Sequence, residues 1–271
     1  LILDEMNLSH VERYFADFLS AMESGDPISL HRNGPEVKTA AGTLVSEEIT
    51  IPKNLFVIGT VNIDETTYMF SPKVLDRANV IEFALTAKNL DNYMKSSGSG
   101  LSTPDPAPAD YGKSFVDFQN KSRNKETLAA ALKDDLETTQ DTITDIFSLL
   151  EGSSMEFGFR TPSEFLRYCE IAHDLSENSK WDCDATCDAQ ILQKILPKLH
   201  GSRRRIESTL VGLASYCSDG DRSEAAKYTS ENSSPSNFKL DQESPRFPES
   251  FAKLKKMIVT VRRDQFVSYI Q

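Results

Sequence analysis

The chain has 271 residues, of which 39% are hydrophobic and 26% are charged, a composition that excludes a collagen-like or wholly disordered protein. Its 41 acidic and 30 basic side chains leave a net charge of −11, which disfavours nonspecific binding to nucleic acid or anionic lipid. At about 150 residues per domain, the length predicts roughly two domains.

Several features bear on where the protein works. Apolar runs such as Leu55–Ile58 are far shorter than the ~18 residues that a membrane-spanning helix needs, and no signal peptide pattern opens the chain. The cysteines are sparse and favour a reducing compartment over a disulfide framework, so we expect a cytoplasmic protein. Because the sequence starts inside an apolar run, we also expect it to be a piece of a longer chain.

Residues 1–86 have the pattern of an α/β domain. The apolar runs 1–3, 54–61 and 80–83 are typical of buried parallel strands. Apolar residues at three- and four-residue steps predict a helix over 9–24, with a capping box formed by Ser9 and Glu12 and a stop at Gly25. Residues 28–51 predict a β-hairpin, which could be a pore element, a partner contact or a decoration of the sheet edge.

The rest of the chain is predicted to be helical. Residues 87–111 include a stretch rich in Ser, Pro and Gly and predict a flexible linker. Residues 112–271 predict an all-helical domain, interrupted by a disordered insert near 218–250. Its expected helices cover about 128–150, 162–176, 184–199, 203–216 and 251–270.

Candidate chemistry begins where the first strand ends. Asp4 and Glu5 directly follow the apolar run, which is the Walker B arrangement of P-loop nucleotide hydrolases. There the first carboxylate lies beside Mg²⁺ and the second activates the water that attacks the γ-phosphate. Two acids can equally end any strand that meets solvent, so this pattern needs support from a second strand.

Asn62 supplies that support because it ends the second predicted strand. A neutral amide at this place can hold an attacking water in line without competing for its proton. The other interpretation is that Asn62 starts a turn with Asp64 and Glu65. Neighbouring parallel strands form the ligand crevice of α/β proteins at their carboxyl ends, which favours the catalytic interpretation.

These segments resemble a known family. Residues 51–83 (IPKNLFVIGTVNIDETTYMFSPKVLDRANVIEF), preceded by LILDEMNLSHVERYFADFLSAME, are similar to the AAA+ ATPases and, within them, to the McrB-type branch of restriction and defence NTPases. The resemblance implies that Asn62 is the sensor-1 residue. It also implies that Arg77, in the L-D-R-A segment, enters the neighbouring subunit's site, although Lys73 could be the acting cation instead.

The helical part extends the resemblance. FGFRTPSEFLRYCEIA, residues 157–172, is similar to the sensor-2 helix with Arg160 at its start, and Arg123 and Arg167 are rival candidates for that role. ILQKILPKLHG and PESFAKLKKMI are similar to lid helices. The expected fold is therefore α/β, a partial AAA+ P-loop NTPase parallel sheet followed by an all-helical lid. The family's strand order places the strand ending in Asp4 beside the one ending in Asn62, with residues 80–83 parallel to both and one position away.

By resemblance, the function is hydrolysis of ATP or GTP by a homo-oligomer, expected as a hexameric ring. Its cofactor would be Mg²⁺, held by Asp4 mainly through water, and its partners a McrC-like endonuclease and DNA, with no membrane. The McrB-type Met-Asn-x-x-Asp-Arg signature is replaced here by Val61–Glu65, which leaves the nucleotide open.

The sequence contains no G-x-x-x-x-G-K-[S/T] phosphate loop, so we expect this chain alone to be inactive. A non-catalytic AAA+-like scaffold is the main alternative, and a nucleic-acid-binding domain is a weaker one.

Other residue patterns favour no site. Cys183 and Cys187 have no second pair for zinc, and the four histidines are scattered without the serine and acid of a catalytic triad. The run Arg203–Arg205 could contact DNA phosphate, but three basic residues opening a helix are more often a solvated face.

Overall fold

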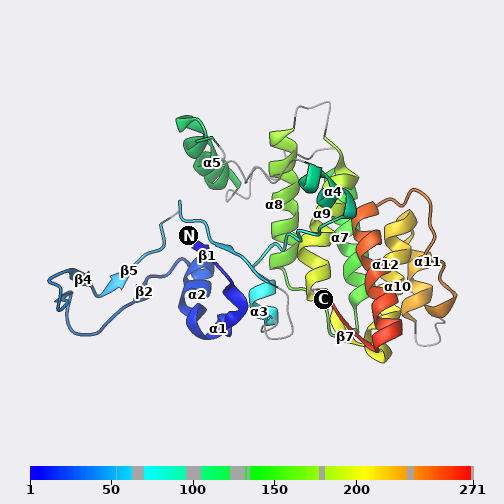
Figure 1. Ribbon diagram of the computed structural model, residues 1–271, viewed down its shortest axis with the longest axis horizontal. Coiled ribbons are helices and arrows are strands. Elements are labelled where there is room, and N and C mark those ends of the chain that lie inside the picture. Colours follow the sequence, from blue (N-terminus) through cyan, green and yellow to red (C-terminus); the bar gives the residue numbers. More distant parts are fainter. Residues whose placement is uncertain are drawn as a thin grey trace.

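The protein is mixed α/β, and its helices and strands gather in two parts. The computed structural model describes residues 1–52, 54–62, 70–95, 105–122, 132, 135–176, 181–230 and 235–269. A small N-terminal part contains β1, α1, α2 and α3, and a larger bundle contains α7 to α12 (Figure 1). We call these the N-terminal part and the helical bundle.

The two strands expected to be neighbours are paired. β1 (Ile2–Leu3) and β6 (Ile58–Gly59) run parallel, with Ile2 opposite Ile58 and Leu3 opposite Gly59, as predicted. Both strands are shorter than expected, and within the described residues they form a two-stranded sheet. The prediction that they are buried is wrong, because Ile2 is 69% exposed and Ile58 is 60% exposed.

The helix predicted over 9–24 is divided into α1 (Val11–Tyr14) and α2 (Ala16–Ser24), after a 3-10 turn, η1 (Met6–Leu8). The residue between them, Phe15, leaves the helical region with φ −114° and ψ 8°. Its ring is buried with Val11 and with Val74 of α3 (Pro72–Leu75). Phe15 therefore packs in a small apolar core at the point where the helix is interrupted.

The predicted stop of this helical stretch is confirmed, whereas its predicted start is wrong. Gly25 lies just past α2 with φ +77°, the left-handed conformation that favours glycine at this place. The expected capping box is wrong, because the residue before α1 is His10 and no side-chain cap is formed there.

The predicted hairpin is present and projects from the N-terminal part as an arm (Figure 1). β2 (Ile28–Ser29) pairs antiparallel with β5 (Glu48–Ile49) at its base. Farther out, β3 (Glu36–Lys38) pairs antiparallel with β4 (Leu44–Ser46).

The third predicted strand, residues 80–83, is not a strand. The backbone N–H of Val80 donates to the carbonyl of Gln193 (2.9 Å), and Glu82 pairs with Lys253 (2.7 Å). The segment therefore finds its partners on the helical bundle rather than on a sheet. Its other side faces solvent, since Phe83 is 93% exposed.

The helical bundle encloses the main core. The predicted helix over 162–176 is α8 (Arg160–Leu175), and the one over 203–216 is α10 (Arg203–Asp219). Residues with almost no exposure, such as Phe165, Leu210 and Leu254, fill the space between the helices. The other long helices are α7 (Leu136–Leu150) and α12 (Pro248–Asp264).

The helix predicted over 184–199 changes its winding twice. It begins as α9 (Cys183–Gln190), continues as a π-helical segment, η2 (Ile191–Ile195), and ends as a 3-10 turn, η3 (Leu196–Lys198). The π segment is where the chain from the N-terminal part attaches, since Gln193 accepts from Val80 and Lys194 donates to the carbonyl of Ala78 (3.2 Å). π-Helical segments often mark such special positions in helices.

The end of the chain corrects the all-helical expectation. Gln265 takes a left-handed φ of +62° and ends α12. The chain then forms β8 (Phe266–Ser268), which pairs antiparallel with β7 (His200–Ser202). This ribbon closes the lower end of the bundle (Figure 1).

The polar stretches contain more structure than expected. The predicted linker includes α4 (Ala87–Lys95), on which no side chain is buried, and leads to α5 (Ala109–Ser122); residues 96–104 lie outside the described residues. The disorder predicted for 218–250 is wrong where that region is described. It forms α11 (Arg222–Thr229) and η4 (Pro235–Asn237), and Phe238 and Phe247 anchor it in the core.

None of the helices in the described ranges is long and apolar enough to cross a membrane.

Candidate active site

The carboxyl ends of β1 and β6 bring together two of the predicted residues. The side-chain amide of Asn62 donates to Glu5 Oε1 at 3.0 Å. Asp4 lies at the same edge and accepts a hydrogen bond from the hydroxyl of Thr60 on the β6 side. Of the three side chains expected to converge, those of Glu5 and Asn62 are in contact, and Asp4 is linked to Glu5 through Thr60. We call Asp4, Glu5 and Asn62 the strand-edge cluster.

Glu5 holds an uncommon backbone conformation. Its φ of 48° and ψ of 48° lie in the left-handed region, where a residue with a side chain pays about 1–2 kcal/mol. Outliers of this kind concentrate at functional sites. The turn occurs immediately after β1 and directs the chain into η1, so it is the point at which Glu5 leaves the line of the strand.

Asn7 is a buried residue that contacts the strand-edge cluster. It is 3% exposed, and its side-chain amide donates to the carbonyl of Asn62 at 3.0 Å. A buried amide that holds the neighbouring backbone limits how far Asn62 can move. No pattern in the sequence indicated a role for Asn7.

The strand-edge cluster suits a magnesium ion by the chemistry of its donors. Mg²⁺ prefers oxygen ligands and is commonly bound through one or two carboxylates, several waters and substrate phosphates. Asp4 and Glu5 supply two carboxylates on an exposed edge. Among the described residues, no group of three or more His, Cys, Asp or Glu side chains is placed to enclose a metal.

The two predicted arginines meet at a different place, between the N-terminal part and the helical bundle. Arg77, just after α3, and Arg160, at the start of α8, both pair with Glu23 on the last turn of α2. Arg77 also donates to the carbonyl of Lys73 (2.8 Å). Within the described part of the chain, neither arginine contacts the strand-edge cluster.

Asp76 extends this network. It accepts from Arg160 (3.1 Å) and from Lys198 (2.8 Å), and Lys198 also donates to the hydroxyl of Thr161 (2.8 Å). Five charged groups thus join α2 and α3 to α8 and η3. We call Glu23, Asp76, Arg77, Arg160 and Lys198 the junction network.

A further lysine is buried beside this network. Lys194 is 1% exposed and pairs with Glu164. Burial lowers the pKa of Lys194, and the Glu164 carboxylate opposes that shift only in part. Because its ammonium also holds the carbonyl of Ala78, we assign Lys194 to attachment of the connecting segment.

The other residues that the sequence suggested for a site have different surroundings in the structure. Arg77 pairs with Glu23 rather than with the neighbouring Asp76, which accepts from Arg160 and Lys198. Arg123 lies outside the described residues, as do Asp64 and Glu65. Arg203 is engaged by Glu207 on the same helix (2.7 Å), whereas Arg204 and Arg205 are exposed.

The four cysteines are free thiols. The hydrogen bond with Cys169 raises the pKa of Cys187 to about 12, and hydrogen bonding to Cys187 raises the pKa of Cys183 as well. Burial raises the pKa of Cys217. Cys169, Cys187 and Cys217 are buried and have the character of core residues, whereas Cys183 is half-buried.

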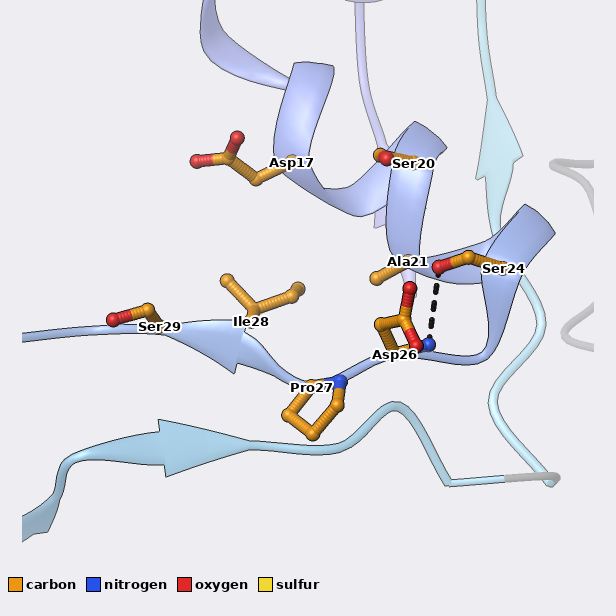
Figure 2. Close-up of a pocket in the computed structure, with 8 residues that line it drawn as sticks. All are labelled: Asp17, Ser20, Ala21, Ser24, Asp26, Pro27, Ile28 and Ser29. Carbon is orange, nitrogen blue, oxygen red and sulfur yellow. Dashed lines mark hydrogen bonds between the residues drawn. The ribbon is translucent and has the colours of Figure 1, made fainter.

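A shallow pocket of about 260 Å³ lies between α2 and β2 at the base of the arm. Figure 2 shows Asp17, Ser20 and Ser24 on the helix side and Ile28 on the strand side, with Asp26 donating its backbone N–H to Ser24 Oγ (3.1 Å). The lining contains two carboxylates and no basic side chain, so it does not suit a phosphate group. None of the predicted site residues lines it.

Besides Asn7, Thr60 and Glu23 contact the predicted site residues without having been predicted from the sequence. Thr60 precedes Asn62 by two positions, and the period of a strand places both on one face. Thr60 could therefore have been predicted to lie beside the site. Glu23 offered no such signal, because its contacts come from segments more than 50 positions away.

Comparison with known families concerns the helical bundle. A family model described as "Domain of unknown function (DUF8727)" matches residues 110–266, more than half of the chain. The chain belongs to this family. The DUF8727 region runs from α5 to β8 and includes Arg160 and Lys198 of the junction network, whereas the strand-edge cluster lies before it. No curated protein and no solved structure matches the chain.

Proposed function

We propose that this DUF8727 protein is part of an AAA+-type nucleoside-triphosphatase, with the strand-edge cluster as its hydrolytic centre. The observation that supports it is the parallel pairing of β1 and β6, which places Asn62 Nδ2 3.0 Å from Glu5 Oε1. The sequence resemblance assigns to these positions an acid that activates water and an amide that orients it. The parallel pairing is the arrangement that such a pair requires.

Each residue of the cluster has a distinct role in this proposal. Asp4 holds the Mg²⁺ side of the site, mainly through water. Glu5 accepts the proton of the attacking water, and Asn62 keeps that water in line with the γ-phosphate. When bound, Mg²⁺ supplies charge neutralisation at the phosphates.

Arg77 and Arg160 belong to the charge-stabilising part of the proposal. Guanidinium groups favour the charge that develops on a transferring phosphoryl group. Both pair with Glu23 in the structure, so each must exchange this carboxylate for a phosphate to act. We propose that Arg77 makes the exchange when subunits assemble into a homo-oligomer, expected as a hexameric ring.

The wider role follows from the same resemblance. We propose that the protein works in the cytoplasm with ATP or GTP and drives a McrC-like endonuclease or another partner on DNA. The net charge of −11 makes direct nonspecific binding of DNA unfavourable. The partner, rather than this chain, would therefore make most of the contacts with DNA.

The test is hydrolysis by the complete protein with Glu5→Gln. The variant should keep nucleotide binding and lose turnover by roughly 10²- to 10⁴-fold, the usual contribution of a general base. Glu36→Gln, on the exposed strand β3 of the arm, is the matched control and should keep full turnover. Unchanged turnover in Glu5→Gln would remove Glu5 from the mechanism.

One observation favours a second candidate, a non-catalytic AAA+-like scaffold. Both arginines are engaged by Glu23 within the chain, as expected of residues that only join two parts of a protein. A complete protein that assembles and binds its partner equally well without nucleotide, and hydrolyses none, would support the scaffold.

A further inference from the structure

Thr60 contacts four consecutive residues across the β1–β6 pair. Its backbone N–H donates to the carbonyl of Leu3 (2.9 Å), and its carbonyl accepts from the N–H of Met6 (2.8 Å). Between these two backbone bonds, its side chain accepts from the N–H of Glu5 (2.9 Å) and donates to Asp4 Oδ1.

The hydroxyl uses both of its capacities at once. A threonine hydroxyl has one proton to donate and two lone pairs to accept with. Here the proton orients the Asp4 carboxylate and one lone pair holds the Glu5 backbone. One side chain therefore couples the orientation of both acidic residues.

The bond to the Glu5 backbone lies at the left-handed turn. A residue at φ 48° relaxes to the extended or right-handed region unless its surroundings hold it. The Thr60 hydroxyl supplies such a hold at the N–H of Glu5 itself. In this conformation the Glu5 carboxylate meets the amide of Asn62.

We propose that Thr60 is a positioning residue, which sets the Asp4 and Glu5 carboxylates for the hydrolytic centre. It acts through these two residues rather than on the nucleotide. The inference rests on the proposed function for its consequence in catalysis, whereas the positioning can be tested on this chain alone. Thr60→Val removes the hydroxyl at nearly constant shape, and Thr60→Ser keeps it.

The first test is amide hydrogen exchange of the ¹⁵N-labelled chain, followed by NMR. In Thr60→Val, exchange at Glu5 should become about tenfold faster, because its N–H loses its acceptor. Exchange at Met6 should stay unchanged, because its acceptor is a backbone carbonyl. Thr60→Ser should restore the slow exchange of the Glu5 amide. Thr50→Val, at an exposed threonine, should leave the exchange of both amides unchanged. Equal protection of Glu5 in Thr60→Val and wild type, or equal loss at Glu5 and Met6, would overturn the inference.

The second test joins positioning to the site, with Mn²⁺ as the probe. Paramagnetic broadening of the Asn62 side-chain amide should need several-fold more Mn²⁺ in Thr60→Val than in wild type, and Thr60→Ser should match wild type. In the complete protein, Thr60→Val should lower kcat more than it changes KM, with recovery in Thr60→Ser. Wild type that binds no Mn²⁺ would contradict the proposed metal role, while the exchange test still decides the positioning. Equal broadening and equal kcat in all three would contradict a positioning role.

Discussion

At the scale of single residues, the backbone conformation of Glu5 and its side-chain contact favour different amino acids. Its left-handed φ favours glycine, whereas its contact with Asn62 requires a carboxylate. A protein under selection for stability alone would place glycine here. A glutamate in a strained conformation is what we expect of a functional residue.

This strain predicts an ordering of variants. Glu5→Gly should be more stable than Glu5→Ala by about 1 kcal/mol, because glycine adopts φ > 0 without a clash and alanine does not. Urea unfolding of the two variants measures the difference. Alanine as stable as glycine would mean that the left-handed turn is not held in solution.

The cysteines give a second prediction at this scale. Because the pKa of Cys187 is raised to about 12, the thiolate that reacts with iodoacetamide is scarce at pH 8. We expect slow labelling of Cys187 in the native chain, about tenfold faster per pH unit, and rapid labelling of the same thiol in urea. Fast labelling of Cys187 in the native chain at pH 8 would contradict its burial.

The sign of the linked stability follows from the same shift. Folding raises the pKa of Cys187 above its ordinary value near 8.5, so the native state holds its proton more tightly. This contribution to stability is complete below about pH 8.5 and is lost as the pH rises towards 12. Stability should therefore fall on the alkaline side.

At the scale of elements, Glu207 links two helices of the bundle. It accepts from Arg203 on its own helix, α10, and from Arg262 on α12 at 2.6 Å. Burial by itself would raise the pKa of Glu207, but the two arginines outweigh it and hold the pKa below its usual range. This carboxylate is therefore ionised throughout the neutral range.

A lowered pKa predicts loss of stability in acid. The stabilisation from Glu207 is present above its ordinary pKa near 4.3 and is lost as the pH falls through the lower native value. Glu207→Gln should cost about 1–3 kcal/mol at pH 7, and the difference from wild type should narrow below pH 4. Thermal unfolding at both pH values measures this. A difference that is the same at pH 7 and pH 3 would exclude the ionic contribution.

Several elements could be predicted from the sequence, and the reasons for the misses are physical. The helix at 160–175 followed from its period, because one face of a helix must be apolar to pack. The short apolar runs at 1–3 and 80–83 predicted buried strands, but burial depends on which segments cover them. The insert at 218–250 is polar on average, yet Phe238 and Phe247 are buried and suffice to anchor it.

The same limit applies to the site. The meeting of Glu5 and Asn62 was predictable, because carboxyl ends of parallel neighbours lie at one edge. The pairing of Glu23 with Arg77 and Arg160 was not, because it depends on how α2, α3 and α8 pack. The sequence pattern shows which face of a helix or strand is apolar, but it does not show which other segment packs against that face.

At the scale of the whole molecule, the junction network connects the N-terminal part to the helical bundle. Glu23 contacts both arginines, and Asp76 contacts Arg160 and Lys198. Partly exposed charge pairs of this kind are screened by salt. The network therefore forms a junction that salt can weaken, and the proposed nucleoside-triphosphatase could use its opening.

Glu23→Gln tests this interpretation. Removing its charge should loosen the junction, with faster hydrogen–deuterium exchange in α2 and α3 and little change in the core of α10. Added salt should produce the same change in wild type. Asp91→Asn, which removes an exposed pair with Lys95, is the control and should have no effect. Hydrogen–deuterium exchange in α2 that is unchanged by both the variant and added salt would contradict an ionic junction.

The central claim is that the strand-edge cluster hydrolyses a nucleoside triphosphate with help from Arg77 of a neighbouring subunit. Mixing complete Arg77→Ala protein with complete Glu5→Gln protein tests it most directly, because intact half-sites then meet at some interfaces. The account predicts that the mixture recovers hydrolysis that neither variant shows by itself. A mixture that assembles normally and is as inactive as each variant would contradict it.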